Sequence, residues 1–187
     1  MIAQTISKKE NLEINFKACS SEEISFDENS FDIITANQCF LYFDIEKMIP
    51  IFNKILAPNG LLVISHFSWM PFLDNVAKAT EDLILKHNPN WTGHSYIGDV
   101  KPTYQGLGSD FKYKSFLYYD EGIPFTKESW RGRIRACRGI GAALSSEAVE
   151  KFDKEHAALL DFITTNEFNI THRIDAHLLT RVNLGCN

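Results

Sequence analysis

Four arginines that lie close together are the residues of this sequence with the clearest potential for ligand chemistry. Arg131, Arg133, Arg135 and Arg138 cluster in a chain whose formal net charge is -5. Helical spacing would place Arg131, Arg135 and Arg138 near one face. Such a face can bind an anionic substrate, or it can form surface ion pairs with nearby acidic residues. We predict Arg131 and Arg135 as substrate-binding residues and keep the ion-pair alternative open.

Three tryptophans add large aromatic surfaces that could form the walls of a pocket. They are Trp69, Trp91 and Trp130. Buried aromatic side chains usually belong to the core, so a purely structural role is the competing interpretation. We predict Trp69 and Trp130 as further substrate-binding residues.

The cysteines and histidines give no sequence signature of a metal site. The four cysteines are far apart in the sequence, which is typical of free thiols in a reducing compartment; they are Cys19, Cys39, Cys137 and Cys186. The six histidines include no His-Glu-x-x-His pattern. His172 and His177 are five residues apart, a poor spacing for one helical face. The sequence therefore predicts no bound metal.

The composition predicts a cytoplasmic globular protein. The chain has 187 residues, of which 44% are hydrophobic and 23% charged, as in ordinary globular domains. Its acidic balance does not suggest a nucleic acid or an anionic membrane as a general partner. No apolar run approaches the roughly 20 residues that span a bilayer. The N-terminus lacks the basic and apolar regions of a signal peptide.

Two apolar runs in the first third predict buried parallel strands, over Phe31–Ala36 and Gly60–Phe67. Between them, apolar residues follow helical spacing after a potential N-cap at Asp44. We expect the main helix to begin at Pro50, because an interior proline removes a hydrogen bond. Alternation of apolar and polar residues predicts another strand over Leu12–Ala18. This pattern is typical of an open α/β sheet with a ligand crevice at the strand ends.

The remainder alternates predicted helices and strands. We expect helices beginning at Pro71, after a cap at Thr126 and after a cap at Ser145. Strands are predicted over Phe111–Tyr119 and Ile174–Val182. Residues 88–110 are rich in Asn, Pro, Gly and aromatics and predict a long loop of the kind that is often functional.

Several of these segments resemble the class I S-adenosylmethionine-dependent methyltransferases, in particular those with a type 11 methyltransferase domain. Ser30-Phe31-Asp32-Ile33-Ile34 resembles the family's fourth strand, and Leu56-Ala57-Pro58-Asn59-Gly60 resembles the turn before its fifth. Residues 125–136 and 172–174 match a subgroup that acts on small molecules. The resemblance implies an incomplete Rossmann-like sheet, strands 3 to 7 of the order 3-2-1-4-5-7-6, with helices on both faces. One partial domain would span 1–187, with a substrate-side insertion or lid over 70–145.

The resemblance also implies S-adenosylmethionine as cofactor and places it at two segments. The loop after the family's third strand meets the adenine, and here it contains Ser20, Ser21 and Glu22. The loop after the fourth strand passes beside the methionine part and the methyl group. In this chain it reads Asn37-Gln38-Cys39-Phe40, and the alternative is that its polar residues merely cap the strand.

The family's glycine-rich loop and acidic ribose-binding residue would lie upstream of Met1 if the resemblance is followed residue by residue. We therefore expect an N-terminally truncated domain, and we keep open the alternative that it is inactive alone. Without the family's first two strands, one edge of Phe31–Ala36 would be bare, and a bare edge is a template for pairing. We expect Leu12–Ala18 or a second copy of the chain to cover it, which makes a homo-oligomer the predicted assembly.

Methyl transfer is an in-line displacement that depends mainly on proximity and alignment. Where a general base is required, His94, His172 and Tyr42 are possible residues. The sequence does not identify the base or the small-molecule acceptor. The principal alternative is a non-catalytic, self-associating remnant of a methyltransferase; a nucleotide-dependent dehydrogenase is less favoured, because no glycine fingerprint follows a strand.

Overall fold

The computed structural model describes residues 2–99, 107–108 and 110–182. Cys186 and, within the predicted loop, residues 100–106 and 109 lie outside this part of the chain. The helices are α1 (Ile2–Lys9), α2 (Ile45–Ile55), α3 (Asn75–His87), α4 (Lys127–Arg135) and α5 (Ser146–Ile163), with short 3-10 turns η1 (Ser21–Glu23), η2 (Phe40–Tyr42) and η3 (Gly93–Ser95). The strands are β1 (Phe31–Asn37), β2 (Leu56–Trp69), β3 (Phe111–Thr126) and β4 (Glu167–Arg181).

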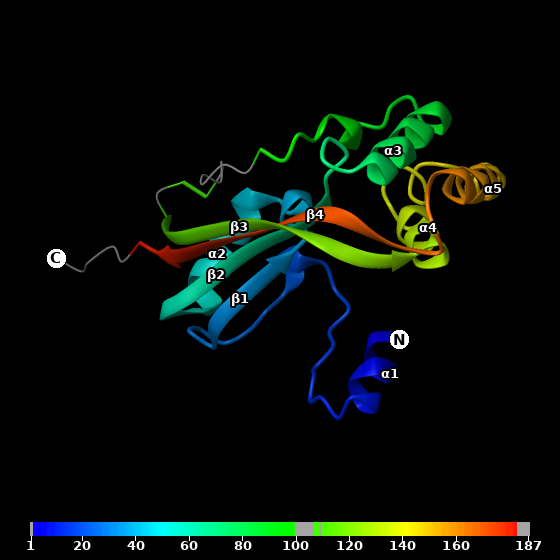
Figure 1. Ribbon diagram of the computed structural model, residues 1–187. Helices are drawn as coiled ribbons and strands as arrows, with labels where there is room; N and C mark the ends of the chain where they lie inside the picture. Colours follow the sequence, from blue (N-terminus) through cyan, green and yellow to red (C-terminus); the bar gives the residue numbers. More distant parts are fainter. Residues whose placement is uncertain (1, 100–106, 109, 183–187) are drawn as a thin grey trace.

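The four strands form one sheet in the order β1-β2-β4-β3 (Figure 1). β1 and β2 run parallel, with Ile33 opposite Leu61 and Asn37 opposite Ser65. β4 is antiparallel to both β2 and β3. The parallel pairing of the two apolar runs is confirmed, and so is the α/β class. The observed order corresponds to strands 4-5-7-6 of the family.

The predicted strand over Leu12–Ala18 is wrong. These residues have no regular structure, and Leu12 and Ile14 are exposed. An alternating pattern becomes a strand only when a neighbouring strand accepts its backbone hydrogen bonds. Within the described chain β1 pairs with β2 alone, so the sheet has no counterpart of the family's third strand. Leu12–Ala18 therefore does not cover the β1 edge.

α2 is continuous through Pro50, contrary to the expected start at that residue. Met48 and Phe52 are buried in the core between α2 and the sheet, on either side of the proline. Their burial stabilises the helix across the one hydrogen bond that proline removes. β2 follows α2 directly, so residues 58–60 belong to the strand instead of a separating turn. Gly60 is needed there, because a Cβ would lie 2.9 Å from the carbonyl oxygen of Asp32.

A second core holds α3, α4 and α5 together beyond one end of the sheet (Figure 1). Asp74 caps α3 instead of Pro71, because its Oδ1 accepts hydrogen bonds from the backbone N–H groups of Val76 and Ala77. Thr126 and Ser145 cap α4 and α5 as predicted. Among the described residues, no helix combines the length and apolar composition needed to cross a membrane.

Candidate functional site

A cavity of about 430 Å³ lies where β1 and β2 end, and we call it the strand-end cavity. Its walls come from the turn after β1, the end of β2, α3 with the loop that follows it, and the end of α4. The residues used below are Gln38, Tyr42, His66, Trp69, Glu81, Trp91, Arg133 and Arg138. Open α/β sheets bind ligands at the carboxyl ends of their parallel strands, and the cavity has that position.

Glu81 provides a buried carboxylate on the wall of the strand-end cavity. Its Oε1 accepts a hydrogen bond from Nε1 of Trp69 at 2.6 Å, and its Oε2 accepts one from Nε1 of Trp91 at 2.5 Å. Burial raises the pKa of Glu81, while the two indole N–H groups act in the opposite direction. Two aromatic walls are thus held in place by one acidic side chain from α3.

Two arginines bring positive charge to the same cavity. The guanidinium of Arg133 lies 4.9 Å from the ring centroid of Trp69. That of Arg138 lies 5.6 Å from the ring of Tyr42 and 5.8 Å from that of Trp91. These distances are typical of cation–π contacts. The cavity therefore presents aromatic faces together with groups of both signs.

The end of β1 and the turn after it carry four of the predicted cofactor residues, and hydrogen bonds connect this segment to β2. Gln38 has a left-handed φ of 59°, its backbone N–H donates to Ser65 O at 2.9 Å, and its side-chain Nε2 donates to Phe67 O. Asn37 Oδ1 accepts a hydrogen bond from Ser65 Oγ at 2.6 Å. Gln38 lines the strand-end cavity, whereas Phe40 is buried in the core under α2. Cys39 is half-buried, and burial raises the pKa of its thiol.

The other predicted cofactor segment lies beside the start of α2. Ser20 precedes η1, and its hydroxyl donates to the Glu22 carboxylate. The other Glu22 oxygen accepts from the Asp44 backbone N–H at 3.2 Å. The Ser20 hydrogen bond, followed by backbone hydrogen bonds, lowers the pKa of Glu22 to about 2. Glu22 is therefore ionised at neutral pH, and Ser21 lies next to it at the start of η1.

Three of the four predicted substrate-binding residues do not line the strand-end cavity. Trp69 does, but Trp130 is fully buried in the helical core and donates its indole N–H to Thr80 Oγ1 at 3.1 Å. Arg131 and Arg135 both bind the carboxylate of Asp153 on α5, and both also bind Glu128. The ion-pair alternative therefore describes these two arginines, while Arg133 and Arg138 reach the cavity.

The possible general bases are dispersed. Tyr42 lines the strand-end cavity, and His94 is exposed with Nδ1 2.8 Å from Trp91 O. His172 is fully buried, donates Nδ1–H to Ile170 O at 2.9 Å and has its pKa lowered by burial. Of the three, only Tyr42 has access to the cavity.

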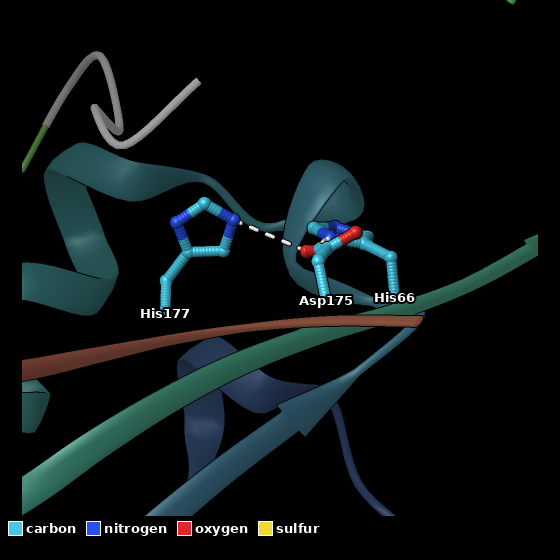
Figure 2. Close-up of side chains that lie close together, drawn as sticks. All are labelled: His66, Asp175 and His177. Atoms are coloured by element: carbon cyan, nitrogen blue, oxygen red, sulfur yellow. Dashed lines mark hydrogen bonds and ion pairs between the residues drawn. The ribbon is translucent and has the colours of Figure 1, made fainter. Parts of the chain in front are cut away.

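Sequence reasoning missed a group of three polar side chains next to the cavity: His66, Asp175 and His177 (Figure 2). They lie on one face of β2 and β4, because the register places His66 opposite Asp175 and His177 follows two residues along β4. The sequence offers no short-range signal for this group, since His66 and Asp175 are 109 residues apart. Glu81 was missed for another reason: an acidic residue on a helix ordinarily faces solvent.

Comparisons with known proteins agree with this geometry. Residues 1–64 match the family model described as a methyltransferase domain. A protein from Anaeromyxobacter dehalogenans, named as a candidate type II methyltransferase, has a TM-score of 0.52 at 12% identity, over 89% of this chain and 71% of that one. The chain has the class I methyltransferase fold. The resemblance inferred from the sequence is confirmed at the level of family model and fold.

Two further solved structures are similar to this methyltransferase-fold chain to a lesser degree. A candidate methyltransferase from an antibiotic biosynthesis pathway of Anabaena variabilis has a TM-score of 0.48 at 14% identity, over 92% of this chain and 78% of that one. The YcgJ protein of Bacillus subtilis has a TM-score of 0.46 at 17% identity, over 95% and 76%. No curated protein matches the sequence.

Proposed function

We propose that this protein takes part in S-adenosylmethionine-dependent methyl transfer to a small molecule held in the strand-end cavity. The observation that carries the proposal is the position of the cavity at the carboxyl ends of the parallel strands β1 and β2, with Gln38 on its wall. A volume of about 430 Å³ suits a small-molecule ligand.

The residues of the two segments predicted to bind the cofactor are chemically suited to an adenosyl group. Glu22 is ionised, and its carboxylate accepts hydrogen bonds from the Ser20 hydroxyl and the Asp44 backbone N–H, with further hydrogen bonds from Ser21 and from its own backbone that lower its pKa. A negatively charged carboxylate at this position can attract hydroxyl or amino groups of a ligand. Gln38 adds an amide group on the cavity wall, and Asn37 adds one at the end of β1. In this proposal Ser20, Ser21 and Glu22 hold the adenosine part, and residues 37–39 hold the methionine part.

The cavity residues would hold and orient the acceptor. The cofactor, when bound, supplies an electrophilic methyl group on a positively charged sulfur. The faces of Trp69 and Trp91 favour a planar or cationic group, and the Glu81 carboxylate lies at the nitrogen edges of both rings. Arg133 and Arg138 favour an acceptor that also carries an anionic substituent. Alignment of this kind is what an in-line displacement requires.

Calorimetric titration with S-adenosylhomocysteine tests the proposal. We expect a micromolar dissociation constant for the unmodified chain and weaker binding after Glu22→Gln. Glu23→Gln is the matched control, since Glu23 belongs to the same turn and is exposed. Absence of binding at millimolar ligand, or equal affinity for both variants, would contradict these roles.

We propose as the second candidate that the chain functions as a self-associating, non-catalytic protein through the β1 edge. β1 and β3 are the two edges of the sheet. β3 carries features that discourage edge pairing, including lysines, acidic residues and a proline. β1 carries one charged residue, Asp32, and its Ile33 is 57% exposed. The unprotected edge therefore favours a second copy of the chain as its partner.

Sedimentation at several protein concentrations tests this second candidate. A dimer is expected, and Ile33→Lys should convert it into a monomer without loss of helical circular dichroism. Leu117→Lys is the control, because Leu117 is similarly exposed on the opposite edge strand. A chain that stays monomeric at every concentration rules the candidate out.

A further inference from the structure

His66, Asp175 and His177 place three metal-ligand atoms in close proximity (Figure 2). Nδ1 of His66 lies 2.8 Å from Oδ2 of Asp175, and Nε2 of His177 lies 3.1 Å from the same oxygen. All three ligand atoms lie within 4.8 Å of one another. The side chains come from adjacent, antiparallel strands in the middle of the sheet, so their relative positions are fixed by the β2–β4 register.

The group is built into the protein instead of gathered on its surface. The Asp175 and His177 side chains are 4% exposed, and that of His66 is 22% exposed. His66 also lines the strand-end cavity, which gives an ion a route from solvent to the two buried ligands. Three polar side chains that are mostly buried need partners for their polar atoms. Either they share hydrogen bonds with one another, or they bind a common cation.

The donor set and the spacing suit a divalent transition metal. Two imidazole nitrogens and one carboxylate oxygen are ligands of zinc and of the neighbouring first-row ions. Ligand atoms about 2.1 Å from a metal lie roughly 3.0 to 3.4 Å apart in octahedral or tetrahedral arrangement. The two N···O distances are close to that range, and the two histidine nitrogens lie within 4.8 Å of each other, so a metal could replace the shared protons once the imidazole rings move closer together.

Neighbouring side chains on β3 hold the His177 ring in orientation. The Tyr113 hydroxyl lies 3.4 Å from His177 Nδ1, the nitrogen that faces away from Asp175. The Phe116 ring stacks on the imidazole with centroids 5.7 Å apart and an interplanar angle of 21°. Metal-binding histidines are commonly oriented by a polar partner on the second ring nitrogen.

We propose that His66, Asp175 and His177 bind one divalent transition-metal ion of the zinc class. Three protein ligands leave at least one coordination position open. Because His66 lines the strand-end cavity, an oxygen-bearing ligand in that cavity can complete the coordination shell. The proposal does not depend on S-adenosylmethionine binding, since the three ligands are separate from the residues assigned to the cofactor.

The alternative is that the three side chains form only a hydrogen-bonded network, in which Asp175 accepts a proton-mediated bond from each histidine. Titration of tag-free, chelator-treated protein with Co²⁺ separates the two, because cobalt bound to imidazole and carboxylate has visible absorption. We expect one Co²⁺ per chain, displaced by Zn²⁺. No absorption, or a stoichiometry unrelated to one ion per chain, would establish the network alone.

Substitutions locate the ion. Asp175→Asn and His177→Gln should each weaken Co²⁺ binding at least tenfold, and His94→Gln should leave it unchanged because His94 is exposed and outside the group. His66→Gln provides a variant at the more exposed ligand if the buried ones fail to fold. Co²⁺ should also raise the melting temperature of the unmodified chain but not that of His66→Gln. Equal affinity in all variants would overturn the assignment.

Discussion

Trp91 and Glu81 are joined by a hydrogen bond of 2.5 Å between the indole nitrogen and a carboxylate oxygen inside the strand-end cavity. The second oxygen of the same carboxylate binds Trp69. One buried acid thus positions the aromatic walls from two sides, and the shape of the cavity depends on it.

Glu81→Gln should lower the free energy of unfolding by about 1 kcal/mol. A glutamine accepts from one indole N–H and turns its own N–H₂ toward the other, which leaves a buried donor without an acceptor. Removing the buried charge offsets part of this loss. Urea denaturation measures the change. Asp82→Asn is the control, since Asp82 is exposed on the same helix and pairs with Lys78; an equal change in both variants would contradict the role of Glu81.

Arg131→Gln and Arg133→Gln should have different effects, although both residues lie on α4. Arg131 is bound by the half-buried Asp153, so its loss should cost about 1 to 2 kcal/mol of stability. Arg133 covers Trp69, so its loss should increase quenching of tryptophan fluorescence by acrylamide. If Arg131→Gln alters quenching and Arg133→Gln does not, the assignment of these arginines is wrong.

His156 should make the protein sensitive to acid. Burial among α3, α4 and α5 lowers the pKa of His156 from 6.5 to about 4. Between these values the unfolded chain binds a proton that the folded chain does not, so stability is present above about pH 6.5 and is lost as pH falls toward about 4. The loss between about pH 7 and about pH 5 should be about 2 kcal/mol.

His156→Gln isolates this contribution, because other buried histidines remain in both proteins. The variant should lose less stability on acidification than the unmodified chain, by about 2 kcal/mol. The exposed His94→Gln should retain the full acid sensitivity. Identical pH profiles for the His156 variant and the unmodified chain would show that this histidine titrates normally.

Asp74→Ala should be more destabilising than Asp44→Ala, although each aspartate precedes a helix. Asp74 caps α3 through two backbone N–H groups and also accepts from the Thr171 backbone N–H at 2.9 Å. Its loss should cost about 2 to 3 kcal/mol. Asp44 makes no side-chain cap bond and pairs with Lys47 on the surface. Thermal unfolding of the two variants compares them, and equal melting temperatures would contradict the dual role of Asp74.

The strands could be predicted where a continuous apolar run in the sequence indicates a buried segment. Phe31–Ala36 and Gly60–Phe67 are apolar runs that only a covered parallel sheet accommodates, and they pair as expected. The strand prediction for Leu12–Ala18 was wrong because an alternating pattern does not by itself provide a partner strand. The predicted helix start at Pro50 was wrong because the burial of Met48 and Phe52 outweighs the unfavourable helix propensity of proline.

The candidate site could be predicted only in part for a similar reason. Gln38 was expected near a ligand because it lies in the segment that resembles the loop after the family's fourth strand, and such a resemblance can be recognised in a short stretch of sequence. Arg131 was expected near a substrate, but it pairs with Asp153 on another helix. The spacing of the arginines in the sequence cannot reveal a partner that is brought close only by the fold. His66 and Asp175 meet only through strand register, which depends on the whole sheet.

The position of β4 has a consequence for how the protein is made. β2 and β3 are not hydrogen-bonded to each other, and both pair with β4, which follows every other described strand in the sequence. A nascent chain therefore cannot close this sheet until β4 has left the ribosome. Until then, β2 can pair only with β1 and keeps one open edge, while β3 has no partner strand, and a chaperone that shields these edges during synthesis would protect the middle of the sheet.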